Sequence, residues 1–134
     1  MQSSKRITPI PISDQNNFER LVSTKNREYI REFVLDDYIT TDNYVDSLPI
    51  DCRLFGTKIF EIKNKDATNA IKFKILACTD PVFGWTEIKG ETSLAAGLKT
   101  YEWDTEPWAY VKIQVCSAVS ATPAKVDAMI ACLN

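Results

Sequence analysis

Residues 70–77 read AIKFKILA, and this segment decides the fold class because apolar and charged side chains alternate along it. Successive side chains of an extended chain point to opposite faces, so every second residue shares a face. The segment therefore predicts a strand with one buried face and one face in water. The buried set is Ile71, Phe73, Ile75 and Ala77, and the solvated set is Lys72 and Lys74. Such alternation is typical of antiparallel sheets, because parallel strands buried on both faces read as continuous apolar runs.

The same alternation recurs in the C-terminal part of the chain. Its inward sets are Ala109, Val111, Ile113 and Val115, then Val126, Ala128, Ile130 and Cys132. Turn residues separate further short extended segments, which is the pattern of an all-β domain. The predicted strands are residues 29–35, 58–62, 70–77, 84–88, 100–103, 109–116 and 125–132. We therefore predict an antiparallel β-sandwich of about seven or eight strands, either jelly-roll or immunoglobulin-like.

Two segments are less regular. In residues 29–35 (YIREFVL) apolar side chains fall on both sides of a strand, with Val34 on one side and Phe33 and Leu35 on the other. We therefore expect both faces of this strand to be partly covered. Residues 36–51 mix acids, Asn and Pro, and they predict a long loop that holds one short extended piece.

The N-terminal segment differs in composition from the rest. Pro9 and Pro11 flank Ile10, and prolines at that spacing forbid a helix and favour an extended path. Residues 13–24 have the pattern of a short helix, capped by Ser13 or Asp14. The predicted organisation is thus an extended N-terminal arm over residues 1–26 and a β-sandwich domain over residues 27–134.

Length and charge argue against several classes of protein. At 134 residues the chain suits one domain. Its formal net charge of −2 gives no general attraction to nucleic acids or anionic membranes, so neither is an expected partner. No apolar run approaches the ~20 residues that span a bilayer, and the first residues lack the apolar segment of a signal peptide. We expect a chain that is made in the cytoplasm.

The cysteines bear on metal and redox chemistry. None of the four has a CxxC spacing, all lie within or beside apolar segments, and the chain has no histidine. A zinc site would therefore need four scattered thiolates. Buried free thiols are the favoured interpretation, with a disulfide and a metal site as the alternatives. The cysteines are Cys52, Cys78, Cys116 and Cys132.

The sequence has no recognisable catalytic constellation. Without histidine there is no Ser-His-Asp or Cys-His arrangement, and the glycines are too scattered for a phosphate-binding loop. Paired carboxylates can hydrolyse glycosides, and acidic loops can bind calcium, but here the acids fall on outward positions and follow no EF-hand order. We predict a non-enzymatic protein without catalytic residues, cofactor or metal. The acids weighed are Glu87, Glu91, Glu102, Asp104 and Glu106 for catalysis, and Asp36, Asp37, Asp42 and Asp46 for calcium.

Aromatic residues gather between positions 85 and 110. Exposed rings can stack sugars, whereas rings at the ends of a sandwich core each bury about 150–250 Å². The core interpretation is favoured, with Trp103 closing the core and Trp108 nearer its rim. The alternative is a glycan site formed by Trp103, Glu106 and Trp108. The whole group is Trp85, Tyr101, Trp103, Trp108 and Tyr110.

Three segments, in order, resemble a known family. They are NAIKFKILACTDPVFGWTEI, KGETSLAAGLKTYEW and PWAYVKIQVCSAVSATPAKVDAMIA, and the likeness extends over residues 56–133. Their strand spacing and turn residues resemble the β-sandwich domain of tailed-phage virion auxiliary proteins, and the layout also occurs in discoidin-like carbohydrate- and lipid-binding modules. Two features depart from the family pattern: a longer turn at residues 80–85, and Lys112 in place of an arginine, which keeps the charge but loses the bidentate fork.

The resemblance implies a virion protein, made in the host cytoplasm, that decorates the capsid or is another head or tail accessory subunit. It implies binding to the major capsid or tail protein through the N-terminal arm and an edge of the sandwich, with homo-oligomers such as trimers. An arm this polar cannot form its own core but can bind along a neighbouring subunit. The expected arm anchors are Ile7, Ile10, Ile12 and Phe18. The alternative function is a carbohydrate-binding module for host attachment.

Overall fold

The computed structural model describes residues 29–134, and this part of the chain forms nine strands and no helix. It accordingly contains no helix long and apolar enough to cross a membrane. The strands are β1 (Tyr29–Ile39), β2 (Val45–Asp46), β3 (Ile50–Asp51), β4 (Thr57–Asn64), β5 (Ile71–Cys78), β6 (Thr86–Leu94), β7 (Lys99–Asp104), β8 (Tyr110–Ser117) and β9 (Lys125–Leu133). The predicted arm, its anchors Ile7, Ile10, Ile12 and Phe18, and the predicted helix over residues 13–24 lie outside the described residues.

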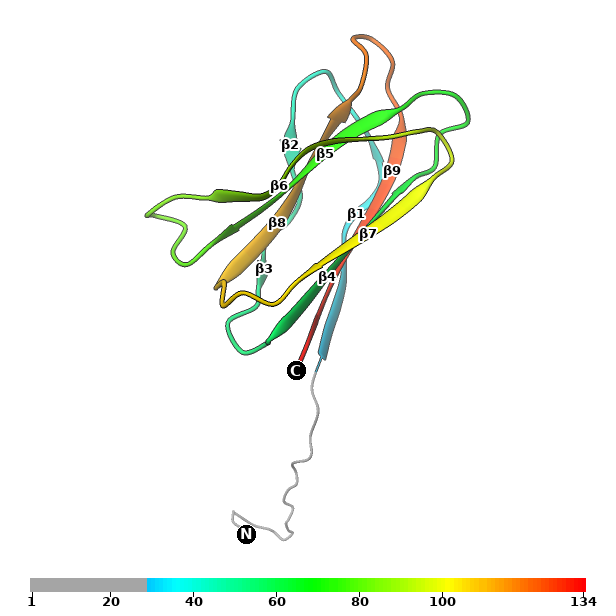
Figure 1. Ribbon diagram of the computed structural model, residues 1–134. Coiled ribbons are helices and arrows are strands. Elements are labelled where there is room, and N and C mark those ends of the chain that lie inside the picture. Colours follow the sequence, from blue (N-terminus) through cyan, green and yellow to red (C-terminus); the bar gives the residue numbers. More distant parts are fainter. Residues whose placement is uncertain (1–28) are drawn as a thin grey trace, which may run out of the picture. The chain divides into compact units, whose positions relative to one another are not determined.

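The strands form two sheets that face each other across one core. One sheet has the order β1-β9-β4-β7, and the other has the order β2-β8-β5-β6, with β3 also paired to β8 (Figure 1). Every strand pair with a determined register is antiparallel. Because the chain crosses repeatedly between the sheets and interleaves its strands in this order, the sandwich is a jelly roll rather than an immunoglobulin-like fold. The predicted all-β antiparallel β-sandwich is confirmed.

The inward rows predicted from alternation form the core. In β5, β8 and β9 the predicted inward side chains are at most 1% exposed: Ile71, Phe73, Ile75, Ala77, Val111, Ile113, Val115, Val126, Ala128, Ile130 and Cys132. Ala109, which lies just before β8, is only partly buried. Phe60 and Ile62 of β4 complete the core from the opposite sheet. Each large apolar side chain buried in this way stabilises the fold by about 1.5–3 kcal/mol.

Strand β1 is longer than the sequence predicts. It continues through residues 36–39, where the acids favour a loop. The φ angle of Asp37 is +51°, and its backbone N–H donates to Oδ1 of Asp127 in β9 at 2.8 Å. An αL residue interrupts regular strand geometry, which aspartate tolerates better than most residues. Val34 and Leu35 are both buried, so both faces are covered as expected, but Phe33 is 62% exposed.

Two strands of two residues each, β2 and β3, lie within the loop predicted at residues 36–51, and both pair with β8. Val45 lies opposite Val115, and Ile50 lies opposite Val111. The prediction of one extended piece was therefore incomplete, because a strand of two residues is too short to show alternation of apolar and polar side chains. Strand β6 likewise extends to Leu94, beyond its predicted end at residue 88.

One charged residue lies inside the sandwich. The side chain of Lys58, at the start of β4, is 0% exposed. Its ammonium group donates to the backbone carbonyl of Glu106 and lies 3.9 Å from Oδ1 of Asp104. These two contacts hold the connection between β7 and β8 against the end of the core. A buried ammonium is tolerated only where such oxygen partners replace water.

We expect Lys58→Ala to lower the free energy of unfolding by about 2–4 kcal/mol, because it leaves a cavity and removes the cation that faces Asp104. Lys58→Met keeps most of the buried volume, so its loss should be about half as large. Urea denaturation followed by tryptophan fluorescence measures both. Equal losses for the two variants would show that packing plays no part, and losses below about 0.5 kcal/mol would contradict a structural role for Lys58.

Candidate functional site

The outer face of the five-stranded sheet has its charges and rings paired within the chain. Nζ of Lys112 lies 4.2 Å from the ring centroid of Trp85, and Nζ of Lys74 lies 4.6 Å from that of Tyr44. The ion pairs are Lys72–Glu91 at 3.4 Å, Lys74–Glu87 at 3.0 Å and Lys112–Asp46 at 2.9 Å. The polar and aromatic groups of this face thus already have partners.

The outer face of the four-stranded sheet is different, because it carries exposed rings beside its open edge. Tyr101 and Trp103 in β7 are 57% and 66% exposed, and their ring centroids lie 6.2 Å apart with 33° between the ring planes. We call these two residues the aromatic pair. Their strand partners in β4 are Glu61 and Ile59. Single exposed apolar residues are common, but adjacent rings with further apolar neighbours mark an interaction surface.

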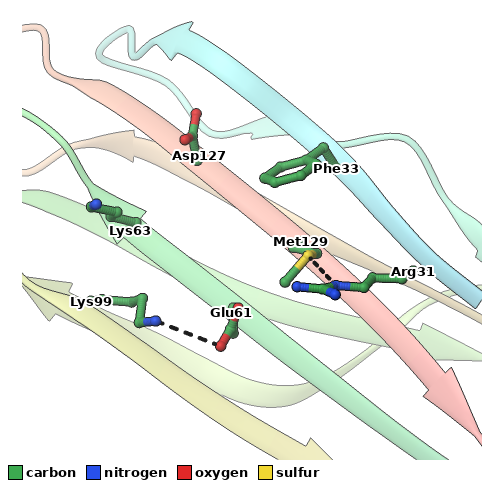
Figure 2. Close-up of a pocket in the computed structure, with 7 residues that line it drawn as sticks. All are labelled: Arg31, Phe33, Glu61, Lys63, Lys99, Asp127 and Met129. Carbon is green, nitrogen blue, oxygen red and sulfur yellow. Dashed lines mark hydrogen bonds and ion pairs between the residues drawn. The ribbon is translucent and has the colours of Figure 1, made fainter.

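A shallow depression, which we call the sheet depression, crosses the same outer face. It has a volume of about 260 Å³, and its side chains come from all four strands (Figure 2). Nε of Arg31 donates to Sδ of Met129 at 3.3 Å, and Nζ of Lys99 lies 3.8 Å from Oε2 of Glu61. Its lining residues are Arg31, Phe33, Glu61, Lys63, Lys99, Asp127 and Met129. Because Glu61 lies opposite Tyr101, the depression adjoins the aromatic pair.

Part of this face has the side-chain types that protein interfaces favour, whereas Glu61, Lys63, Lys99 and Asp127 are of types that interfaces disfavour. Aromatic residues, Met and Arg are enriched at interfaces, and the face presents Phe33, Tyr101 and Trp103 together with Met129 and Arg31. The alternation in β7 indicated that Tyr101 and Trp103 share a face, but the sequence offered no signal for the contributions of β1 and β9.

The predicted core position of Trp103 is wrong, and the pairing of β7 with β4 explains why. Phe60 and Ile62 of β4 are buried in the core, and their partners in β7 are Glu102 and Thr100. Directly opposite residues of an antiparallel pair share a face, so Glu102 and Thr100 lie on the inner side. Trp103 and its strand neighbour Tyr101 must therefore point outward.

Trp85 and Tyr110 also differ from the core interpretation, whereas Trp108 agrees with it. Trp85 lies on the outer face of the five-stranded sheet against Lys112, and Tyr110 has the guanidinium of Arg53 at 5.6 Å from its ring centroid. Trp108 is partly buried and packs against the core, which agrees with its predicted place at the rim. Of this group, Trp108 therefore contributes most directly to the core.

The residues of the predicted glycan set are divided between two places. Glu106 and Trp108 line a depression of about 210 Å³ together with Thr79 and Pro107. Nε1 of Trp108 is buried and has no hydrogen-bond partner within the described residues. Trp103 does not line this depression and belongs to the aromatic pair instead. The structure thus joins Glu106 with Trp108, and Trp103 with Tyr101.

Four of the five carboxylates weighed for catalysis have structural partners, and Glu106 lines the depression beside Trp108 instead. The contacts are Glu87–Lys74 at 3.0 Å, Glu91–Lys72 at 3.4 Å, Glu102–Lys89 at 3.2 Å, and Asp104 with the N–H of Glu106 at 2.8 Å. The hydroxyl of Tyr44 also donates to Glu91 at 2.8 Å, and with Lys72 it holds the pKa of Glu91 below its ordinary value. These four acids hold strands and turns together.

The aspartates weighed for calcium are spread over several contacts. Asp36 and Asp37 lie close to Asp127 of β9, but the ammonium of Lys65 pairs with Asp37 and lies 3.0 Å from Asp127. The hydrogen bond from Lys65 lowers the pKa of Asp37. The other two are engaged elsewhere: Asp42 accepts from the hydroxyl of Ser120 and the N–H of Ala121, and Asp46 accepts from Lys112 and Gln114.

The four cysteines are buried free thiols, as predicted. The thiol of Cys52 donates to the carbonyl of Trp108 at 3.3 Å. Burial raises the pKa of Cys52, and it raises the pKa of Cys132 to about 11. Thiols with a raised pKa stay protonated at neutral pH and are poor nucleophiles.

The fold is similar to those of phage-derived and viral proteins. It matches the PBSX exported protein XepA with a TM-score of 0.58 and 13% identity, over 78% of this chain and 37% of that chain. It matches the SPBc2 prophage-derived protein YomS with a TM-score of 0.53 and 12% identity, over 81% of this chain and 96% of that chain. The match to VP2 of the infectious bursal disease virus subviral particle has a TM-score of 0.52 and 8% identity, over 81% and 33% of the two chains.

Identities this low establish the fold alone, and they confirm the resemblance to phage-derived β-sandwich proteins at that level. The chain spans about 37% of XepA and 33% of VP2 but nearly all of YomS. Comparisons of the sequence with protein families and with curated proteins found no match.

The contact of Lys65 with Asp37 and Asp127 predicts a pH dependence of stability. A carboxyl whose pKa is lower in the folded state stabilises the fold above its unfolded pKa, and this stabilisation is lost as pH falls through the folded value. Lys65→Met should therefore destabilise the protein at pH 7 and lose progressively more of that effect at acid pH, as the pH falls through the lowered pKa of Asp37. Urea denaturation at neutral and at acid pH measures the difference.

Lys99→Met serves as the control, because it removes a cation from an exposed pair with Glu61 at 3.8 Å, where such pairs contribute little. We expect its effect to be smaller and to change less with pH. A destabilisation by Lys65→Met that is equal at both pH values would contradict the ionic role of Lys65.

Proposed function

We propose that this protein is a non-enzymatic structural subunit of a tailed-phage virion, a capsid decoration or other accessory subunit. It binds the lattice of the major capsid or tail protein through residues 1–26 and through an edge and outer face of the sandwich. The observation that carries the proposal is the jelly-roll fold, shared with phage-derived and viral particle proteins, combined with an outer face whose aromatic residues have no cover within the described chain.

The N-terminal arm supplies the first contact in this proposal. Residues 1–26 are polar, with a few apolar side chains and two prolines at positions 9 and 11. Such a segment cannot bury enough apolar surface to fold alone, but it can order along a partner. Its anchors are Ile7, Ile10, Ile12 and Phe18. Many arms acting on one lattice give avidity beyond that of any single contact.

The sandwich supplies the second contact. A stable interface buries about 800 Å² on each partner, with an apolar centre and a polar rim. The face formed by the aromatic pair and the sheet depression offers both kinds of group: exposed Phe33 lies on β1, Tyr101 and Trp103 lie on β7, and charged residues such as Lys63 lie on the strands between them. Among the described strands, β1 ends the same sheet, and its edge lies beside this face.

We expect the full chain to co-sediment with assembled phage particles in a density gradient, quantified by mass spectrometry. Removal of residues 1–26 should lower its occupancy on particles at least ~10-fold, because each subunit then keeps only one of two contacts. Circular dichroism checks that the truncated chain remains folded. Absence of the full chain from particles would contradict the virion role, whereas unchanged occupancy of the truncated chain would contradict only the role of the arm.

A matched pair of full-length variants separates the anchors from the charge of the arm. Ile10→Asp with Ile12→Asp removes two anchors, whereas Ser3→Asp with Ser4→Asp adds the same charge and removes none. Only the double variant Ile10→Asp with Ile12→Asp should lower the occupancy of the chain on phage particles.

A carbohydrate-binding module for host attachment is the second candidate function, and the geometry of the aromatic pair is the observation that favours it. Two rings with centroids 6.2 Å apart, both more than half exposed, offer a surface on which sugar rings can stack. The depression lined by Glu106 and Trp108 adds a carboxylate and a further aromatic side chain.

In this candidate function, titration with a glycan panel should quench tryptophan fluorescence and saturate. Trp103→Ala should abolish the change, because it removes one of the stacking rings, and Trp108→Phe should reduce it if the second depression takes part. Phe83→Ala, in the exposed turn between β5 and β6, is the control and should bind as the parent does. Fluorescence that does not respond to any glycan would exclude this candidate.

A further inference from the structure

Strand β7 leaves one row of backbone groups without a partner in its own sheet. It ends the order β1-β9-β4-β7, and among residues 29–134 it pairs only with β4. The N–H of Asn64 donates to the carbonyl of Leu98 at 2.9 Å, in the same register as the rest of the β4–β7 pair. Hydrogen-bonded pairs alternate along an antiparallel ladder. Thr100, Glu102 and Asp104 therefore bond to β4, and the odd-numbered residues between them point their N–H and C=O groups to the open edge.

These edge-facing residues are also the ones whose side chains lie on the outer face. They are Lys99, Tyr101 and Trp103, all exposed. Natural proteins cover such edges, or place charges and prolines on them, to prevent pairing with other chains. Here two of the three edge-facing residues are aromatic, and such side chains favour strand pairing. The one charged residue among them is a lysine, which an aromatic ring can accept as a neighbour.

We propose that β7 pairs antiparallel with β7 of a second copy of this chain, which joins the two four-stranded sheets into one continuous sheet. Tyr101 lies on the two-fold axis opposite Tyr101 of the second copy, and Lys99 lies opposite Trp103. Each edge-facing residue has one N–H and one C=O. In this register every one of these groups finds a partner in the other copy.

Other registers satisfy fewer groups. A shift by one residue sets edge-facing residues against residues such as Thr100 and Glu102, whose backbone groups already bond to β4. A shift by two in one direction sets Glu102 opposite itself, which places like charges together. A shift by two in the other direction sets Trp103 opposite Gly97, beyond the strand. The backbone and the side chains therefore select the same register.

The side chains of the selected register are complementary. Directly opposite residues have Cβ atoms about 4.5–5.5 Å apart, so the ammonium of Lys99 reaches the indole of Trp103 on each side of the axis. The rings of the two copies form one aromatic patch centred on Tyr101. A two-fold contact of this kind is closed, and it predicts a dimer where the family resemblance alone implied homo-oligomers such as trimers. The inference does not rest on the virion role, and the outer face stays open to other partners.

Disulfide cross-linking tests the register. Hydrogen-bonded partners have Cα atoms about 5.5 Å apart, within the range that a disulfide spans. Tyr101→Cys should therefore form a covalent dimer of twice 15.2 kDa under mild oxidation, seen on non-reducing gels. Lys99→Cys is the matched control and should not cross-link, because its equivalent in the other copy lies four residues away along the strand. The native cysteines are all buried and do not interfere.

Sedimentation velocity of the full chain tests the equilibrium. We expect a concentration-dependent dimer, and Trp103→Lys should raise its dissociation constant at least ~10-fold, because two lysines then face each other on each side of the axis. Phe83→Lys, which changes a 91% exposed residue away from the edge, should leave it unchanged. A monomer at all concentrations up to about 100 μM, where standard interfaces associate, would overturn the proposal. So would a dimer unaffected by Trp103→Lys, or one in which Tyr101→Cys fails to cross-link, since either assigns the contact to another surface.

Discussion

Which side of β7 faces the core depends on its register with β4, and much of the surface chemistry of this protein follows from that pairing. Phe60 and Ile62 of β4 must be buried, so their partners Glu102 and Thr100 lie on the inner side of β7. The alternation of a strand then places Tyr101 and Trp103 in water. A slip of one residue would reverse both sets, burying the rings and exposing Glu102. The same register decides which backbone groups of β7 bond to β4 and which remain at the edge.

The two outer faces of the sandwich differ in how their side chains are covered. On the five-stranded sheet, lysines pair with acids on neighbouring strands and cover Trp85 and Tyr44, so few groups there gain from a partner. On the four-stranded sheet, Phe33 and Trp103 stay 62% and 66% exposed. Exposed pairs of charges contribute little to stability, whereas exposed rings lose little on transfer to an interface and gain the full benefit of burial there. Recognition is therefore more favourable on the four-stranded sheet.

Sequence patterning predicted the central strands well and the edges poorly, for a physical reason. Residues in β5, β8 and β9 have a neighbouring strand on each side and a sheet across the core, so their alternation reports burial directly. Strand β7 also alternates, but its apolar side chains point outward, because at the edge the inner side needs less apolar surface and tolerates Glu102 beside Lys89. The period shows that Tyr101 and Trp103 share a face, yet it cannot show which face is buried. Similarly, the sequence did not indicate that β1 continues through Asp36 and Asp37, because the contact that stabilises Asp37 comes from Lys65, which is distant in sequence.

Pairing at β7 and binding through the outer face would reinforce each other. A depression of about 260 Å³ that is shallow and partly charged offers a single subunit only modest affinity for a flat partner. A dimer presents two such faces on one continuous sheet, and its second contact forms at the high effective concentration set by the first. In the proposed virion role, the two subunits would then already be ordered relative to each other in the dimer before they bind the lattice. In this way the same strand that the β4 register turns outward supplies both the edge that joins two copies and the rings that they offer to a third partner.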